Sequence, residues 1–316
     1  MSETNETSLK YPTEVMLEAC TLCQLNCPRC YMRLEDNCGL GKGYLSFENF
    51  KSFVALNPYV KEIELSNSGE IFLNPELDKI IKYAFLNGVI LTATGGVNFN
   101  TVSDTVLRYL VKYKFKAISI SIDGWDQDSY QTYRRNGNFN KVIQNIQQLN
   151  SYKKYYSTDT PELIWKYIIM EHTDNLIGAK EAQKIAKHLG MKFVFSQDWD
   201  GYIPKSINTP NLFCGWNIPC ADLWTQPQIN WDGKFLGCCV ANYYTYDDVN
   251  LFKVPLKDYI QNKSVKDTKK MLMNNISSDT KINSGCEKCW AYLQMKKDDN
   301  FITLKELANG GRIIGT

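Results

Sequence analysis

The chain has 316 residues, and its 36 lysines and arginines nearly balance 34 aspartates and glutamates, for a formal net charge of +2. This balance excludes a strong electrostatic attraction to nucleic acid or to a membrane surface. No apolar run approaches the roughly 18–20 residues of a membrane-spanning helix, and the polar amino terminus lacks the apolar core of a signal peptide. We therefore expect a cytoplasmic protein with neither nucleic acid nor a membrane as its partner.

Short β-branched runs alternate with longer helical stretches from residue 14 to residue 196. The strand candidates, in chain order, are 15–19, 62–66, 89–93, 117–122, 164–170 and 192–195, and the helix candidates between them are 46–56, 75–86, 103–113, 139–149 and 176–189. The expected N-caps are Ser46, Asn74, Ser103 and Asn138, and the expected stops are Gly88 and Gly190. This regular repetition predicts a parallel α/β domain, either an open doubly wound sheet or a barrel.

Beyond residue 197 the alternation of strand and helix ends. A segment rich in Asp, Asn, Pro and aromatic residues leads to a hairpin-like piece at 227–238, a polar helical stretch and a final helix after Cys289. We therefore expect a polar tail at 1–13, an α/β domain at 14–199, a linker at 200–213, a small second domain at 214–308 and a tail at 309–316.

Eleven cysteines in a chain without a secretion signal indicate metal binding rather than disulfides. Three of them, Cys23, Cys27 and Cys30, lie on one short loop directly after the first strand candidate. Three thiolates can hold three irons of a cubane [4Fe–4S] cluster and leave the fourth iron open for chemistry, whereas an electron-transfer ferredoxin closes its site with a fourth cysteine. The alternative is a zinc site in which Cys20 joins these three.

The position and spacing of this loop resemble those of the radical S-adenosylmethionine (SAM) enzymes. The family usually has an aromatic residue before the third cysteine, where this chain has Arg29, with Tyr31 just after it. The resemblance implies a partial (β/α)6 TIM-like barrel, open on one side, with its working residues at the carboxyl ends of the strands. It also implies a SAM-binding [4Fe–4S] cluster on the three cysteines.

A second motif of the family follows the second strand candidate. Ser68, Gly69 and Glu70 resemble its Gly-Gly-Glu turn, with a serine in place of the first glycine. In that turn the glutamate receives the methionine amino group of SAM. A carboxylate can satisfy a buried ammonium, and a glycine lets the backbone approach a ligand.

A third motif follows the fourth strand candidate. Ser121, Asp123 and Arg134 match residues that, in the resembling enzymes, contact the ribose and the methionine carboxylate of SAM. An arginine fork can take a carboxylate through two parallel hydrogen bonds. The segment 92–98 parallels the family's Thr-Asn-Gly turn, which implies a role in shaping the floor of the pocket.

The cysteines near the carboxyl terminus resemble the SPASM group of auxiliary-cluster domains. No cysteine follows Cys289, which implies the shortened form called twitch, with one auxiliary [4Fe–4S] cluster. Its four ligands would be Cys220, Cys238, Cys286 and Cys289. Cys239 is an alternative to Cys238, and a structural zinc ribbon is an alternative to the cluster.

Five further residues have weaker signals. Cys20, Cys38 and Cys214 have no assigned role, and we expect small buried or half-buried side chains there. His188 lies in a helix candidate and is expected to be structural. His172 follows the fifth strand candidate, where it could act on a substrate or be an ordinary loop residue.

The resemblance implies that SAM is cleaved reductively to a 5′-deoxyadenosyl radical, which abstracts a hydrogen atom from the substrate. A flavodoxin- or ferredoxin-type protein would be the reductant. The single auxiliary cluster resembles the aminocyclitol dehydrogenase type. We therefore expect an oxidoreductase that oxidises or epimerises a carbinol carbon of a sugar-like small molecule, with the auxiliary cluster as electron acceptor. The aromatic and polar loop at 199–204 is a candidate lining of the substrate pocket.

Two alternatives stay open. The first is modification of a peptide or protein side chain by oxidation, epimerisation or cross-linking, against which we note that only 22 residues precede Cys23, too few for a leader-binding domain at that end. The second is a non-catalytic iron–sulfur or zinc-binding protein. It predicts no SAM cleavage and no effect of replacing Glu70 or Arg134. The substrate and the general base stay unassigned.

Overall fold

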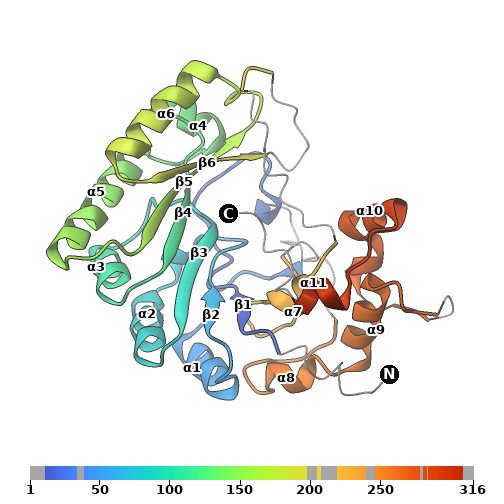
Figure 1. Ribbon diagram of the computed structural model, residues 1–316. Helices are drawn as coiled ribbons and strands as arrows, with labels where there is room; N and C mark the ends of the chain where they lie inside the picture. The colour runs from blue at the N-terminus through green and yellow to red at the C-terminus, as the bar shows by residue number, and fades with distance from the viewer. Residues whose placement is uncertain are drawn as a thin grey trace.

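The computed structural model describes residues 11–33, 39–197, 205–207, 219–239, 246–277, 280–282 and 284–308. Its centre is one sheet of seven strands in the order β6-β5-β4-β3-β2-β1-β7, with every neighbouring pair parallel (Figure 1). The strands are β1 (Glu14–Leu17), β2 (Glu62–Glu64), β3 (Ile90–Val97), β4 (Ala117–Ser121), β5 (Glu162–Ile169), β6 (Lys192–Gln197) and β7 (Gln228–Ile229). The predicted parallel α/β architecture is confirmed.

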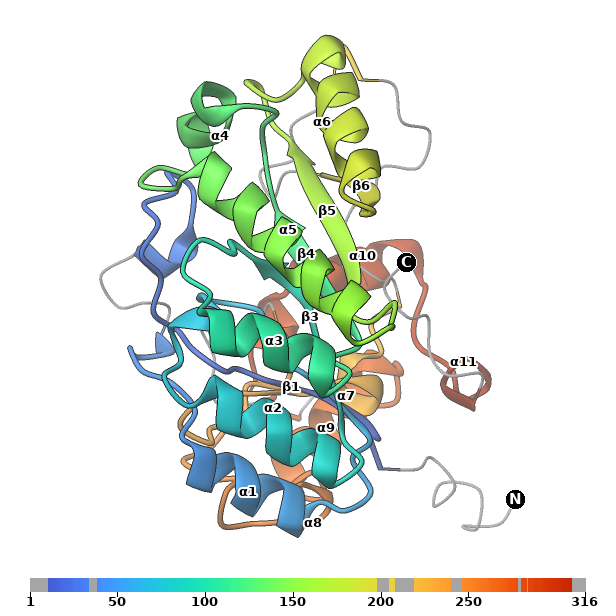
Figure 2. The ribbon, with the colours of Figure 1, turned by 90° about the vertical axis from the view of Figure 1, so that its left-hand side faces the viewer.

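The winding of the sheet is that of a barrel wall. Strands β1 to β6 lie side by side in sequence order, and the helices between them cover one face of the sheet (Figures 1 and 2). These helices are α1 (Phe47–Leu56), α2 (Leu77–Leu86), α3 (Asp104–Lys112), α4 (Gln127–Tyr133), α5 (Phe139–Tyr155) and α6 (Leu176–His188). A doubly wound sheet would reverse its strand order and carry helices on both faces. Among the described strands β6 and β7 are the two edges, so the wall is open.

Local sequence explains most helix ends. Ser46, Ser103 and Asn138 cap α1, α3 and α5, because each side chain accepts the backbone N–H three residues further on. Gly88 and Gly190 follow α2 and α6 with φ of 70° and 67°, a left-handed conformation that favours glycine. These expectations are confirmed.

Asn74 does not cap α2. That helix begins at Leu77, and the side chain of its N-cap, Glu76, makes no capping hydrogen bond. The Asn74 amide instead donates to the carbonyl oxygens of Ala19 and Leu45, both at 2.9 Å. It therefore ties the loop after β2 to the chain after β1.

Two of the differences from the prediction, the end of β3 and the presence of helix α4, have a physical reason. Strand β3 runs on to Val97, so most of segment 92–98 is a strand with an irregular register rather than a turn. Helix α4 was not a candidate because only Tyr130 of its residues is buried, which leaves no apolar periodicity. A capping box between Asp126 and Ser129 starts it.

The carboxyl-terminal part contains the expected hairpin, but one arm of it has an unexpected partner. Ile229 bridges Phe235 in antiparallel fashion, and Gly233 turns the chain with φ of 92°. The first arm is β7, which pairs with β1 and extends the sheet. The remaining helices are α7 (Asp222–Thr225), α8 (Leu256–Tyr259), α9 (Lys263–Leu272), α10 (Trp290–Asp298) and α11 (Leu304–Ala308). They lie on the side of the sheet opposite α1–α6 (Figure 1).

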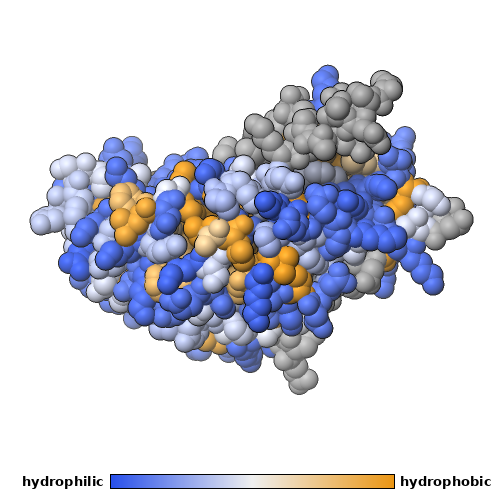
Figure 3. Space-filling view, turned by 90° about the horizontal axis from the view of Figure 1, so that it is seen from below, coloured by the Kyte–Doolittle hydropathy of each residue, from blue (hydrophilic) through white to orange (hydrophobic). Residues whose placement is uncertain are grey.

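The face seen from below has a mixed hydropathy. In the view from below it is mostly hydrophilic, with apolar residues scattered in between (Figure 3). None of the helices in the described part of the chain is long and apolar enough to cross a membrane.

Candidate metal centre and cofactor site

The loops that follow β1, β2 and β3 meet at the carboxyl edge of the sheet. Tyr31, at the end of the cysteine loop, donates a hydrogen bond from its hydroxyl to Ser68 Oγ at 3.1 Å. Asn98, just beyond β3, donates from Nδ2 to Cys23 Sγ at 3.6 Å. Parallel strands present their carboxyl ends at one edge, so motifs far apart in sequence are brought together there.

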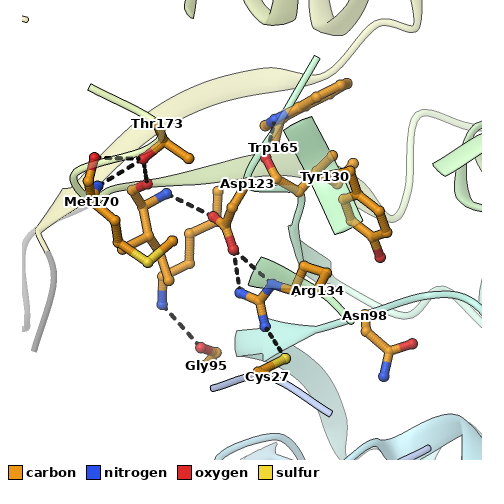
Figure 4. A network of polar contacts seen from close by, with 12 residues as sticks. Cys27, Gly95, Asn98, Asp123, Tyr130, Arg134, Trp165, Met170 and Thr173 are labelled. Carbon is orange, nitrogen blue, oxygen red and sulfur yellow. Dashed lines mark hydrogen bonds and ion pairs between the residues drawn. The ribbon is translucent and has the colours of Figure 1, made fainter. Parts of the chain in front are cut away.

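The three loop cysteines lie on a tight turn with different exposures. Cys23 is exposed, Cys27 is buried and Cys30 is half-buried. The Cys30 N–H donates to Cys27 O at 3.2 Å, which closes the turn. Arg134 donates from NH1 to Cys27 Sγ at 3.8 Å (Figure 4). Hydrogen bonds to the sulfurs are one means by which a protein tunes a bound cluster.

The zinc alternative requires Cys20 beside the three loop cysteines. Cys20 is fully buried and bridges to Tyr44 as strand backbone. Zinc bonds each thiolate at about 2.3 Å and so gathers four sulfurs closely, whereas in a cubane each thiolate binds a different iron. The three loop cysteines can supply the thiolates of a cubane without Cys20, and the choice of the cluster over zinc stays a prediction.

Gly69 has a role in packing. A Cβ at this position would lie 2.2 Å from Cys20 O and 2.8 Å from Leu22 O, both on the chain that enters the cysteine loop. The next residue, Glu70, donates its N–H to Leu22 O at 2.8 Å. The missing side chain therefore lets the cysteine loop pack directly against this turn.

Gly69→Ala is expected to displace the cysteine loop, because backbone atoms cannot move aside as a flexible side chain can. We call the predicted site on Cys23, Cys27 and Cys30 the first centre. We expect the substitution to lower the affinity of the first centre for iron about tenfold or more. Iron and sulfide bound per protein, measured across an iron titration, check this. Gly88→Ala is the control, since it meets nothing within 4 Å and costs only about 1 kcal/mol of backbone strain. Equal iron binding by both variants would contradict the packing role.

Glu70 is fully buried, and its carboxylate is held by the backbone. Oε2 accepts the Asn98 N–H at 2.6 Å, and Oε1 accepts the Phe72 N–H at 3.4 Å. Burial raises the pKa of Glu70 to about 7, against the opposing effect of these N–H donors. A carboxylate in such surroundings gains from a cationic partner. This is the property that a receptor for an ammonium group needs.

A second buried carboxylate, Glu18, was missed by the sequence interpretation. It follows β1, and its Oε2 accepts the Ser68 N–H at 3.0 Å. Its Oε1 is buried without a hydrogen-bond partner among the described residues. Its only sequence signal was a charged residue at the end of a buried strand. Glu18 supports the Ser68–Glu70 turn from the side of β1.

Glu18→Gln is expected to stabilise the protein in alkaline solution. Burial raises the pKa of Glu18 from near 4.5 to about 7, so the folded protein binds this proton more tightly than the unfolded chain. Stability is therefore lost as pH rises through this window, by up to about 3 kcal/mol once the carboxylate is charged. Thermal unfolding of both proteins at about pH 5 and about pH 8 checks the sign, because the gain should appear only at the higher pH. The same difference at both values would refute it.

Asp123 and Arg134 form a buried ion pair. Arg134 Nε and NH2 donate to Asp123 Oδ2 at 2.6 and 2.5 Å, with side-chain exposures of 14% for the arginine and 0% for the aspartate. Asp123 Oδ1 accepts the Ile168 N–H at 2.8 Å (Figure 4). Both oxygens of Asp123 thus have protein partners. The aspartate fixes the guanidinium between β4 and Cys27.

The second set of cysteines lies beside the hairpin. Tyr246 Oη and Cys286 Sγ are hydrogen-bonded at 3.8 Å, and burial raises the thiol pKa of Cys220, Cys238 and Cys286. Asn67, next to Ser68, donates from Nδ2 to Cys239 O at 3.3 Å. This backbone contact places the 238–239 segment against the turn after β2. The ligand set with Cys289 and the choice between Cys238 and Cys239 stay predictions.

The remaining candidates are placed as follows. His172 stacks on Tyr133 with ring centroids 6.0 Å apart, and the Arg134 guanidinium lies over the same Tyr133 ring. His188 is the last residue of α6, and Cys20 is buried as expected. Cys38, Cys214 and the loop 199–204 lie outside the described residues.

No protein-family model matches the chain, and no curated protein matches it. Solved structures share its fold. Streptococcus suis SuiB gives a TM-score of 0.61 at 11% identity, over 81% of this chain and 67% of SuiB. SuiB bound to S-adenosylmethionine gives 0.61 at 13% identity, over 89% and 71%. SuiB bound to the precursor peptide SuiA gives 0.62 at 12% identity, over 89% and 70%. At these identities the likeness concerns the fold.

Proposed function

We propose that this chain is a radical SAM enzyme. The observation that carries the proposal is the meeting of the three-cysteine loop, the buried Glu70 and the Asp123–Arg134 pair at one edge of a barrel-like sheet. The structural neighbours of the chain are radical SAM enzymes, and SuiB binds S-adenosylmethionine. The fold and the order of the motifs along it both support this proposal.

Each motif then has a task in binding. Cys23, Cys27 and Cys30 would hold the SAM-binding [4Fe–4S] cluster. Glu70 would receive the methionine ammonium, since its burial makes a cationic partner favourable. The N–H groups of Arg134 that Asp123 leaves available would meet the methionine carboxylate.

Ser121 would contact the ribose, and Ser68 would shape the turn that carries Glu70. When bound, the cluster and SAM supply the reductive cleavage that yields a 5′-deoxyadenosyl radical. The protein positions the substrate and excludes water.

For the substrate we propose a sugar-like small molecule that is oxidised or epimerised at a carbinol carbon. Cys220, Cys238, Cys286 and Cys289 would hold one auxiliary [4Fe–4S] cluster, which in the oxidation would accept the electron that the substrate radical loses. The hydrogen bond from Asn67 Nδ2 to Cys239 O supports this, because it holds the 238–239 segment against the turn that carries Glu70. A second candidate, modification of a peptide, is favoured by the neighbour SuiB bound to its precursor peptide.

The first test is formation of 5′-deoxyadenosine by anaerobically reconstituted, chemically reduced protein given SAM. Stimulation by the small-molecule fraction of a cell extract would support the sugar-like substrate. Stimulation by the macromolecular fraction would support the peptide instead. No deoxyadenosine at full iron loading would refute the radical SAM proposal and favour a non-catalytic iron–sulfur protein.

Cys289→Ala tests the auxiliary cluster. Because the first centre is left intact, SAM cleavage should persist, while product formation should fall about tenfold or more for want of an electron acceptor. Deoxyadenosine and oxidised product are quantified in the same reaction. Unchanged product formation would rule out the electron-acceptor role.

A further inference from the structure

Lys166, on the face of the sheet opposite α1–α6, has no role in the proposed function. Lys166 lies on β5 opposite Ser121 of β4, so the two side chains point to the same face. Its neighbours Trp165 and Tyr167 are fully buried on the other face, where Trp165 packs against Phe139 of α5. Side chains alternate along a strand, so Lys166 points away from the helices and into the concave side.

The ammonium of Lys166 lies next to the proposed ribose site. Its Nζ donates a hydrogen bond to Gly95 O at 3.1 Å, drawn at Gly95 in Figure 4. A Cβ on Gly96 would lie 2.7 Å from Ser121 Oγ and 3.9 Å from Lys166 Nζ. Gly96 therefore lies beside both groups, and its missing side chain leaves the position next to them unfilled. Lys166 is half-buried and its hydrogen bond to Gly95 O is at an exposed position, so a ligand can reach the ammonium.

The carboxylates that act on Lys166, Asp123 and Glu64, already have other hydrogen-bond partners. Asp123 is bound by Arg134 and by the Ile168 N–H. Glu64 accepts hydrogen bonds from the hydroxyl and N–H groups of Ser66 and Thr94, at 2.6 to 2.8 Å. In the described part of the chain no carboxylate forms an ion pair with Lys166.

This arrangement is unfavourable for a lysine without a ligand. Burial is the largest effect on its pKa and lowers it, with Arg134 acting in the same direction, and Asp123 and Glu64 oppose them. A desolvated cation gains most from an anion within hydrogen-bond distance. Arg134, which contacts Cys27 Sγ, and Cys239 of the second cysteine set both act on Lys166 electrostatically.

We propose that Lys166 binds an anionic group, a carboxylate or a phosphate, on the small-molecule substrate. The inference rests on the proposed function and narrows its substrate to an acidic or phosphorylated sugar-like molecule. An anion held at Nζ would lie on the same face of the sheet as Ser121, the residue proposed to contact the ribose of SAM.

Differential labelling tests the proposal without relying on turnover. Reconstituted protein is acylated with acetic anhydride in the presence of glucuronate, glucose 6-phosphate, glucose or glucosamine, and each lysine is quantified by peptide mass spectrometry. We expect glucuronate or glucose 6-phosphate, but neither glucose nor glucosamine, to slow labelling of Lys166 at least about threefold. Protection by only one anion identifies the carboxylate or the phosphate as the group that is bound. Lys116, exposed and paired with Glu62 at 2.7 Å, is the internal control.

Equal protection by glucose, or no protection by either anion, would overturn the proposal. A second test uses the extract metabolites that bind an anion exchanger. Lys166→Met should remove any stimulation of SAM cleavage by this fraction, and Lys166→Arg should keep most of it. The control variant Lys116→Met should keep all of the stimulation. Deoxyadenosine formed by the wild-type protein with SAM alone is measured in parallel. If it is absent while anions protect Lys166, the proposed function fails and the anion site stands.

Discussion

Cys27→Ala is expected to abolish SAM cleavage and to remove about half of the iron bound by the reconstituted protein. The first centre has only three protein ligands in this proposal, so the loss of one leaves two irons without a thiolate. Cys27 is the buried member of the loop, with Arg134 NH1 at 3.8 Å from its sulfur. The substitution also leaves that guanidinium without its sulfur partner. Iron analysis and deoxyadenosine formation, measured on the same preparation, check both parts.

Cys20→Ala is the matched control for this experiment. Cys20 is fully buried only three residues before Cys23, yet it lies outside the proposed ligand set. Its replacement costs about 1 kcal/mol for the small cavity and should leave iron and SAM cleavage unchanged. If Cys20→Ala instead lost the metal as completely as Cys27→Ala does, the zinc site with four cysteines would be the better description.

The fold was predictable where the determinants are local. The β-branched runs, the caps at Ser46, Ser103 and Asn138, and the glycine stops each act within a few residues of the chain. Strand β7 was not predictable as part of the sheet. It is two residues long, and its partner Met16 lies far away in sequence, so only the folded chain pairs Met16 with Gln228.

The same distinction holds at the candidate site. The motif residues were found because spacing identifies them, and the fold brings Glu70 and Arg134 to the cysteine loop. What each residue contacts depends on other loops. Gly69 is constrained by the chain that enters the cysteine loop, and both oxygens of Asp123 are engaged within the protein. No sequence pattern marked Lys166 as a candidate site residue, because a single lysine in a strand candidate normally faces solvent.

Asp123→Asn is expected to destabilise the protein by about 3–5 kcal/mol, because it leaves a buried guanidinium without its counter-charge. The asparagine keeps the size of the side chain and an oxygen for the Ile168 N–H. The loss therefore reports on the charge of the pair. For a domain of this size it corresponds to a fall in Tm of about 10 °C. The proposed function adds weaker SAM binding, because Arg134 loses the partner that aims it at Cys27.

Asp123→Asn combined with Arg134→Gln separates pairing from general damage. In the double variant no buried charge is left unmatched, so the two losses should fall short of additivity by up to about 3 kcal/mol. SAM affinity should nevertheless stay low in the double variant, since the guanidinium is gone. Stability is read from denaturant unfolding, and affinity from calorimetry on the reconstituted protein. Recovery of stability without recovery of SAM binding would establish that Asp123 acts through Arg134. Strictly additive losses in stability would mean that the ion pair does not position the arginine.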